Sequence, residues 1–267
     1  MALAQISTVS SPRTRSDFVV LGAWSLPRII HGFTTRESGV STGSYCSFNL
    51  ADGVGDDANA VRANWARWHA AYPQTRVARL QQVHGNRVHP IDFDYAGERK
   101  FGDGMVTDVP GIVLAIFTAD CVPVLMVDAE AGIAGALHAG WRGTLADIAS
   151  AGVHVMAAQG ARPHRIRAAL GPCIGRCCFE VDAELADRFV MQIPTAAACC
   201  NPGRPGKKHL DLRGIIRSQL QQAGLEKTSI VDVGPCTRCN SDRFFSRRAA
   251  GGALTGLQMS FIGFEPE

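Results

Sequence analysis

The chain has 267 residues, of which 46% are apolar and 19% are charged, and it carries a net charge of +3. This composition is typical of a folded α/β or α+β protein and excludes a disordered chain. The longest basic blocks are the pairs Lys207-Lys208 and Arg247-Arg248, and apolar runs stay below 18 residues, so we expect neither nucleic-acid binding nor a membrane span.

The N-terminal segment differs from the rest of the chain. Residues 1–17 are rich in Ser, Thr and Arg and contain no acidic residue before Asp17. No internal repeat and no long linker divides the remainder. We therefore expect a flexible leader over residues 1–17 and a single catalytic domain over residues 18–267.

Nine cysteines indicate the redox compartment. Their number is odd, and two pairs are adjacent in sequence, Cys177-Cys178 and Cys199-Cys200. Neighbouring cysteines rarely bridge each other, and disulfide frameworks belong to small secreted domains. We expect reduced thiols and a cytoplasmic protein.

The N-terminal half is predicted to be rich in strands. Two strands precede a Gly/Ser/Thr-rich loop over residues 34–47, and Asp56-Asp57 is a helix N-cap signal for a helix that ends at Pro73. Apolar runs then predict central strands, the last two joined by a hairpin turn. The predicted strands are residues 19–24, 28–33, 77–83, 87–92, 112–118, 122–127 and 133–138.

The C-terminal half contains more helix. We expect one helix over about residues 144–159, a short helix capped by Asp182, and an amphipathic helix over residues 211–224. Strands are expected at residues 165–170, 229–233 and 257–264, and residues 194–208 have the strongest loop character. Because strands and helices do not alternate regularly, we predict an α+β fold with one compact sheet system.

Three apolar segments end in residues that bind metals. His84, Cys121 and His138 each follow such a run and have small or polar neighbours. A thiolate and two imidazoles form a zinc set of three protein ligands that leaves a fourth position open, as in catalytic sites. Their spacing is neither that of a zinc finger nor that of H-E-x-x-H, and a single His or Cys is more often a packed core residue. Spacing alone therefore does not establish a metal site.

Two carboxylates are candidates for proton transfer. Asp120 precedes Cys121 and can orient a ligand or carry protons, or else form the turn before the next strand. Glu180 is either an acid/base group or a carboxylate near a helix start.

Three further residues are candidates for substrate binding. Arg142 lies within His138-Ala-Gly-Trp-Arg-Gly143, just before the predicted helix, where free N–H groups favour an anion such as phosphate. Arg36 and Asn49 flank the early loop and can close over a ligand. The alternatives are a packed glycine-rich turn and ordinary loop residues.

The segment Cys236-Thr-Arg-Cys239 has C-x-x-C spacing. No second pair follows at zinc-ribbon spacing, and no thioredoxin-like βαβ pattern surrounds it. We therefore expect this pair to be dispensable for metal binding and redox chemistry.

Six motifs occur in an order that resembles one known family. Together they are similar to those of the YfiH family, the laccase-domain proteins also called polyphenol oxidase family purine nucleoside phosphorylases. The resemblance runs from about residue 28 to the C-terminus. The motifs are Thr34-Thr-Arg-Glu-Ser-Gly-Val-Ser41, Gln82-Val-His84-Gly85, Thr118-Ala-Asp-Cys121, His138-Ala-Gly-Trp-Arg-Gly143, Gly171-Pro-Cys-Ile-Gly175 and Phe245-Ser-Arg-Arg248.

The resemblance implies a single layered α/β/β/α domain similar to cytotoxic necrotizing factor deamidases. It implies a zinc site made by His84, Cys121 and His138. The implied activities are phosphorolysis of adenosine, guanosine, inosine and methylthioadenosine, and hydrolytic deamination of adenosine. Copper as the cofactor is disfavoured, because the eight histidines include no His-x-His pair.

These expectations assign roles to the candidate residues. Asp120 or Glu180 would move the proton in deamination, and Arg36 and Arg142 would hold phosphate. Asn49 would contribute to substrate binding from the early loop.

The C-terminal motif departs from the family pattern. Ala249 stands where the family commonly has Asp, Leu257 where it has Arg, and Ser38 where it has Gly. Two other functions stay open. One is a Cys–His hydrolase that edits cell-wall peptide precursors, with Cys121 as nucleophile and His138 as base. The other is a non-enzymatic partner-binding module. The sequence determines neither the preferred nucleoside nor the oligomeric state.

Overall fold

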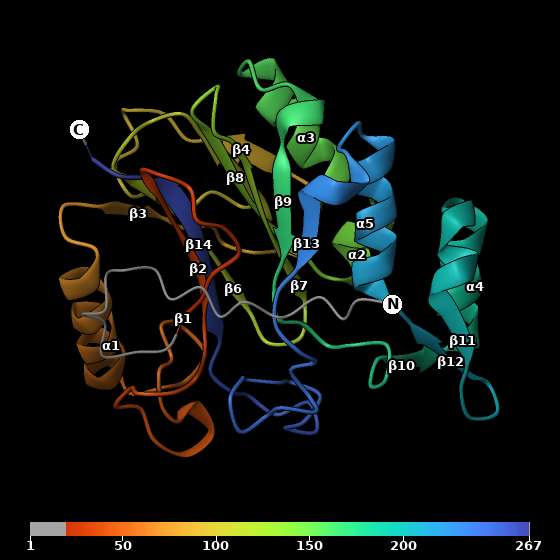
Figure 1. Cartoon of the computed structure of the whole chain (residues 1–267). Coiled ribbons are helices and arrows are strands. Elements are labelled where there is room, and N and C mark those ends of the chain that lie inside the picture. Colours follow the sequence, from red (N-terminus) through yellow and green to blue (C-terminus); the bar gives the residue numbers. More distant parts are fainter. Residues whose placement is uncertain (1–19, 267) are drawn as a thin grey trace.

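The computed structural model describes residues 20–266 (Figure 1). The leader expected over residues 1–17 lies outside the described residues. Within the described part, no helix has both the length and the apolar character needed to cross a membrane.

A five-stranded sheet brings the two ends of the domain together. Its order is β1-β2-β14-β6-β3. The strands are β1 (Val20–Leu21), β2 (Ile29–Thr34), β14 (Gln258–Phe264), β6 (Ile112–Thr118) and β3 (Arg76–Ala78). β14 lies antiparallel to both neighbours, with Phe261 opposite Gly32 on one side and Ala115 on the other. The C-terminal strand therefore joins the N-terminal strand to the middle of the chain.

A six-stranded sheet packs against the first. Its order is β13-β9-β7-β8-β5-β4. The strands are β13 (Ile230–Asp232), β9 (Arg167–Leu170), β7 (Val122–Asp128), β8 (Ile133–Ala139), β5 (Gly104–Thr107) and β4 (Val88–Pro90). The hairpin expected between β7 and β8 is confirmed, and Asp128 Oδ1 stabilises its turn by accepting hydrogen bonds from the amides of Glu130 and Ala131. The sequence patterns missed β5.

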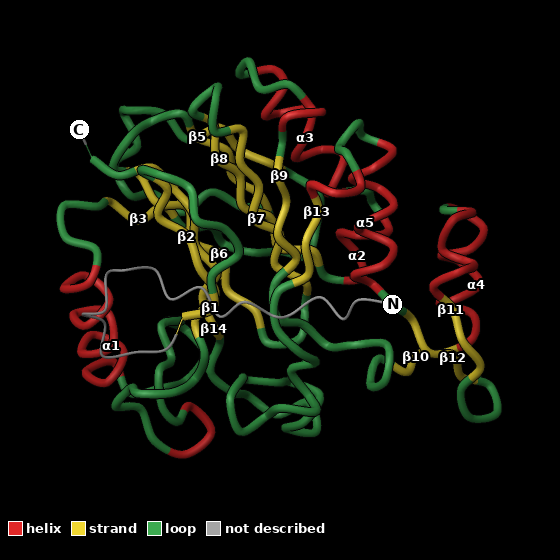
Figure 2. Tube along the Cα trace, in the orientation of Figure 1, coloured by secondary structure: helices red, strands yellow, loops and turns green. Residues whose placement is uncertain are grey.

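Helices cover the outer faces of both sheets (Figures 1 and 2). α1 (Ala58–Ala71) lies against the five-stranded sheet, and its N-cap is Asp57, as the sequence predicted. The helices α2 (Trp141–Leu145), α3 (Ile148–Ala158) and α5 (Leu212–Gln222) lie against the six-stranded sheet. The order of layers is therefore helix, sheet, sheet, helix, which confirms the expected α/β/β/α architecture.

The side-chain alternation of β6 shows how one strand serves two layers. Ile112, Leu114 and Ile116 belong to the core between the two sheets. Val113, Ala115 and Phe117 belong to the core under α1. Successive side chains of a strand point to opposite faces, so a continuous apolar run is expected where both faces are covered.

A smaller three-stranded sheet lies beside the main layers (Figure 2). It consists of β10 (Glu180–Asp182), β12 (Lys207–Leu210) and β11 (Cys200–Pro202), and it is associated with α4 (Ala183–Gln192). The prediction of a loop over residues 194–208 was wrong, because this stretch contains a 3-10 helix (Pro194–Cys199), β11 and the start of β12. Its many Pro and Gly residues mark turns between very short elements.

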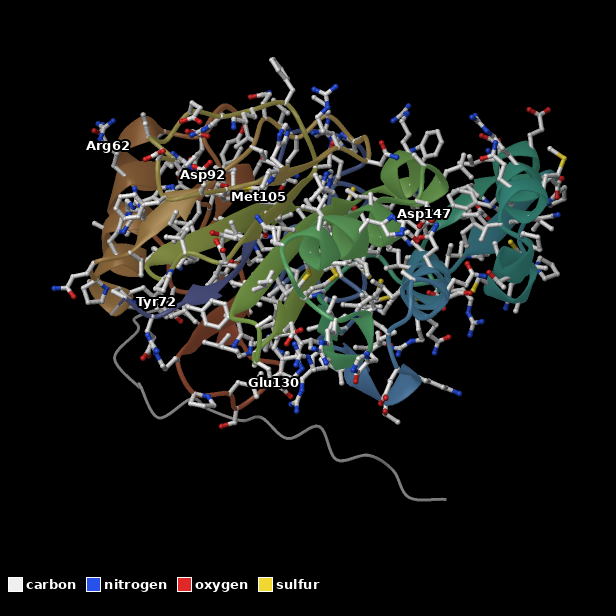
Figure 3. The ribbon with its side chains drawn as sticks, turned by 90° about the horizontal axis from the view of Figure 1, so that it is seen from above. Arg62, Tyr72, Asp92, Met105, Glu130 and Asp147 are labelled. Carbon is white, nitrogen blue, oxygen red and sulfur yellow. The ribbon has the colours of Figure 1, made fainter. Side chains whose placement is uncertain are left out.

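The single helix predicted over residues 144–159 was also wrong. The chain forms α2 and then α3, separated at Asp147, which has a left-handed backbone (φ 57°) and is labelled in Figure 3. Its side chain accepts a hydrogen bond from Ser150 N, so Asp147 is the N-cap of the second helix.

Candidate active site

His84, Cys121 and His138 meet at one point between the sheets, and we call them the metal trio. Their ligand atoms all lie within 4.8 Å of one another. His84 comes from the loop after β3, Cys121 from the link between β6 and β7, and His138 from β8. His138 is buried, Cys121 is half-buried and His84 is exposed, so one side of the trio is open.

Asp103, just before β5, holds the trio from behind. This fully buried carboxylate accepts a hydrogen bond from His138 Nδ1 at 2.8 Å, which leaves Nε2 for a ligand. It also accepts from the amides of His84 (2.9 Å) and Gly85 (2.7 Å). One carboxylate therefore orients the ring of His138, as carboxylates behind metal-binding histidines commonly do, and also fixes the backbone at His84.

Asp103 was not among the residues predicted from the sequence. The signal available was an acidic residue between two glycines at the start of a strand, Gly102-Asp-Gly104, where burial without a partner would be costly. Its partners lie 19 and 35 residues away along the chain.

The trio has a distinctive charge distribution. Burial alone would raise the pKa of the Cys121 thiol, but the charge and hydrogen bond of His138, together with contact from His84, lower that pKa to about 6. Burial would lower the pKa of His138, but the Cys121 thiolate and the Asp103 carboxylate raise it to about 9. The cysteine is thus held as a thiolate, the form in which cysteine binds metals.

Two glycines of the motif after His138 allow close approach to the trio. A Cβ atom at Gly140 would lie 3.1 Å from both Cys121 Sγ and His84 Cδ2. A Cβ atom at Gly143 would lie 2.7 Å from the carbonyl oxygen of Gly85. The glycines are needed because backbone passes directly beside the ligands.

Asp120 connects the trio to the C-terminal loops. Asp120 is buried and has a positive φ of 98°. Oδ1 accepts a hydrogen bond from Thr237 Oγ1 at 2.6 Å, and Oδ2 accepts one from Arg248 N at 2.7 Å. Strained backbone of this kind is often found beside functional sites.

The open side of the trio faces a cavity of about 850 Å³. Asp120 and all three members of the trio line it. The lining also contains apolar side chains. Its charged residues, Asp120 included, are four arginines and two aspartates. The charged lining residues are Asp52, Arg79, Arg99, Asp120, Arg247 and Arg248.

Two expected binding residues serve the framework instead of lining this cavity. Arg36 donates to Ser241 O at 2.7 Å, and its guanidinium lies over the Phe245 ring. Asn49 is fully buried, and its amide binds the backbone of Ala51 and Leu257. Both residues tie the early loop to itself or to the C-terminal segment.

Glu180 and Arg142 also lie outside the lining of the cavity. Glu180 forms an ion pair with Arg204, which holds the pKa of its carboxyl at about 2. The Arg142 guanidinium lies 4.3 Å from the centre of the Trp141 ring, in a separate depression near Arg188. The structure does not bring either residue together with the trio.

The chemistry of the trio fits a metal ion. A soft thiolate with two imidazoles is a suitable donor set for zinc, and the buried carboxylate behind His138 completes it. Among residues 20–266, the groups of three or more potential ligands are this trio and a set of four cysteines considered below. Multicopper chemistry would require several imidazole-rich centres.

Comparison with known proteins identifies the family. Residues 30–265 match the family model described as multi-copper polyphenol oxidoreductase laccase. The chain belongs to this family. The resemblance to YfiH proteins is confirmed by the crystal structure of a hypothetical YfiH protein from Bacillus licheniformis, with a TM-score of 0.86 and 31% identity, covering 94% of this chain and 98% of that one.

Two sequence relatives carry functional names. A purine nucleoside phosphorylase of Mycobacterium tuberculosis is 42% identical over 241 residues, which are 89% of this chain and 93% of the relative. The adenosine deaminase RL5 of an unknown prokaryotic organism is 39% identical over 233 residues, 82% of this chain and 87% of the relative.

Proposed function

We propose that this protein is a metal-dependent enzyme of purine nucleosides. It cleaves adenosine, guanosine, inosine and methylthioadenosine with phosphate, and it also deaminates adenosine. The observation that carries the proposal is the metal trio at the wall of a cavity rich in arginine. A cavity of about 850 Å³ is within the range of small-molecule sites, and the names of the relatives match both reactions.

The metal in this proposal is zinc, held by His84, Cys121 and His138. When bound, zinc supplies Lewis-acid chemistry and lowers the pKa of a coordinated water. Asp103 fixes His138 with Nδ1 protonated, which leaves Nε2 as the nitrogen that would hold the ion. Thiolate ligands persist in a reducing compartment, which supports a cytoplasmic location.

Two charged residues of the cavity have the remaining roles in this proposal, phosphate binding and proton transfer. Arg247 lines the cavity and makes no side-chain hydrogen bond to residues 20–266, so its guanidinium is available for phosphate. Asp120 lies next to Cys121 and is the carboxylate of the cavity closest in sequence to the trio. In the proposed deamination it accepts and returns the proton at its carboxylate oxygens.

The four residues outside the cavity lining take framework roles in this proposal. Arg36 and Asn49 hold the early loop, and Glu180 holds the turn that contains Arg204. Arg142 lies over Trp141 and is a matched control for Arg247, because it is also an arginine of a family motif but lies outside the lining of the cavity.

The test compares Arg247→Ala with Arg142→Ala in two assays on adenosine. With phosphate, ribose 1-phosphate is measured; without phosphate, inosine is measured. Losing one charge-assisted contact costs roughly 1.5–3 kcal/mol, or about 10- to 150-fold in kcat/KM. We expect Arg247→Ala to lower phosphorolysis by this factor with a smaller effect on deamination, and Arg142→Ala to leave both near wild type. The opposite ranking would refute the assignment of phosphate to the cavity.

A second candidate function follows from one feature of the geometry. Cys121, His138 and Asp103 form a chain like that of a cysteine hydrolase, in which thiolate, imidazole and carboxylate follow one another. Metal analysis of Cys121→Ser separates the two functions. Loss of one zinc equivalent per chain together with both activities supports the zinc enzyme, whereas wild-type zinc content with lost activity makes Cys121 a nucleophile.

A further inference from the structure

Four cysteines from two distant segments converge beside the cavity, and we call them the four-cysteine cluster. Cys177 and Cys178 lie in the loop after β9, and Cys236 and Cys239 lie in the loop after β13. Their sulfur atoms all lie within 4.8 Å of one another. Cys236-Thr-Arg-Cys239 therefore has a second pair of cysteines as partners, contrary to the prediction, and this pair comes from about 60 residues earlier in the chain.

The sulfur spacing fits one metal ion rather than disulfides. Cys239 Sγ lies 3.7 Å from Cys177 Sγ and 3.3 Å from Cys178 Sγ. A disulfide requires about 2.05 Å. Four sulfurs at about 2.3 Å from a central tetrahedral zinc ion are roughly 3.8 Å apart. The observed distances are close to the second arrangement.

The surroundings of the sulfur atoms also suit a thiolate site. Gly175 N donates a hydrogen bond to Cys236 Sγ at 3.2 Å, and Arg238 Nη1 donates one to Cys178 Sγ at 3.5 Å. A Cβ atom at Gly175 would lie 3.3 Å from Cys177 Sγ and 3.1 Å from Cys236 Cβ. One backbone amide and one cation thus face the sulfurs, as is usual around metal-bound thiolates.

We propose that Cys177, Cys178, Cys236 and Cys239 bind one structural zinc ion, separate from the trio. On binding, each thiol loses its proton to solvent and forms one Zn–S bond, with no change of oxidation state. The four thiolates leave the site with a formal charge of minus two, and Arg238 offsets part of this charge. With four protein ligands the site is closed to substrate, as structural zinc sites are.

The position of the cluster gives the ion a structural role in the wall of the cavity. Thr237, between the two cysteines of the C-x-x-C segment, donates to Asp120 Oδ1 in the cavity wall. Arg248 Nη1 donates to the carbonyl oxygen of Cys178 at 3.1 Å. The ion therefore links the two loops that hold Asp120 and Arg248 beside the trio, so its loss loosens that wall of the cavity.

The test is the zinc content per chain of the wild type and four variants, all purified under reducing conditions without added chelator. We expect Cys239→Ser to contain about one zinc equivalent fewer than wild type. Cys121→Ser, in the trio, loses a different equivalent, so the double variant loses both. Cys46→Ser is the matched control, since Cys46 is exposed and outside both groups. Wild-type zinc content in Cys239→Ser would overturn the proposal, whatever the result for Cys121→Ser.

A second measurement needs no variant and covers the case in which Cys239→Ser fails to fold. X-ray absorption of the wild-type zinc protein gives the mean number of sulfur ligands per ion. Four sulfurs at the cluster and one at the trio predict about 2.5, whereas the trio alone predicts about 1. A value of about 1, or a wild-type mass lower by two hydrogens from a disulfide within the cluster, would overturn the proposal.

Discussion

Replacing Asp103 by Asn tests whether one buried carboxylate organises the metal trio. The substitution keeps the shape but removes the charge and turns one acceptor oxygen into a donor group. Asp103 accepts hydrogen bonds from His138 Nδ1, His84 N and Gly85 N, all of which are donors. The new amide must therefore face at least one donor without accepting from it.

The expected losses can be estimated from these contacts. Removal of the carboxylate behind a metal-binding histidine weakens metal affinity about 10- to 100-fold, which is roughly 1.4–2.8 kcal/mol. In the metal-free protein, weaker charge-assisted bonds lower the free energy of unfolding by about 2–4 kcal/mol. Both losses should appear together, because the same oxygens hold His138 and the loop at His84.

Asp128→Asn is the matched control. Asp128 is also fully buried, accepts from the amides of Ala131 and Arg162, and lies at the opposite end of β7 from Cys121. Seven residues of strand separate them by about 23 Å. This variant should lose stability and keep wild-type zinc affinity.

Two assays separate the effects. Competition with a chromophoric chelator measures the Kd for zinc, and urea denaturation of the metal-free proteins measures the free energy of unfolding. If Asp103→Asn loses stability to the same extent as Asp128→Asn but binds zinc as tightly as wild type, then Asp103 supports the fold and does not position the ligands.

Three further predictions concern single positions. Gly140→Ala should reduce zinc content, because its Cβ would lie 3.1 Å from Cys121 Sγ and His84 Cδ2; unchanged zinc content by metal analysis would contradict this. Asp57→Ala should lower the free energy of unfolding by about 1 kcal/mol in urea, since it removes the N-cap of α1, and an unchanged midpoint would contradict it. His31 is held neutral by burial, with its pKa lowered from 6.5 to about 4, so the unfolded chain takes up the proton first as the pH falls. Stability should therefore decrease between pH 6.5 and 4 by up to about 3 kcal/mol, and His31→Gln, measured by urea denaturation across this range, should lack that component; an identical pH profile would contradict the reasoning.

Local patterns predicted much of the fold. The apolar run of β6 was predicted with the bounds that the structure has, because both of its faces are covered. The N-cap at Asp57 and the turn at Asp128 were also readable, since the hydrogen-bonding groups lie within a few residues. The helix break at Asp147 was missed, because neither Gly nor Pro stands in residues 144–151 to mark it, and Asp147 itself adopts the left-handed backbone.

The sequence by itself determined the family and selected His84, Cys121 and His138 as the candidate metal ligands. Both depend on short motifs whose residues carry specific chemistry, and His84, Cys121 and His138 stand in those motifs. The structure places the three residues together. The order of the motifs did not predict which other residues contact the trio or line the cavity beside it.

Only the tertiary structure decided which further residues belong to the sites. Asp103 reaches His138 across 35 residues, and Cys177 reaches Cys239 across 62. Arg142, only four residues from His138 in sequence, lies outside the lining of the cavity that the trio faces, while Arg247 lies in it. The physical reason is that sequence periodicity specifies which face of a helix or strand is buried. The pairing of strands and the packing of the two sheets specify which distant loops lie together at one end of the sheets.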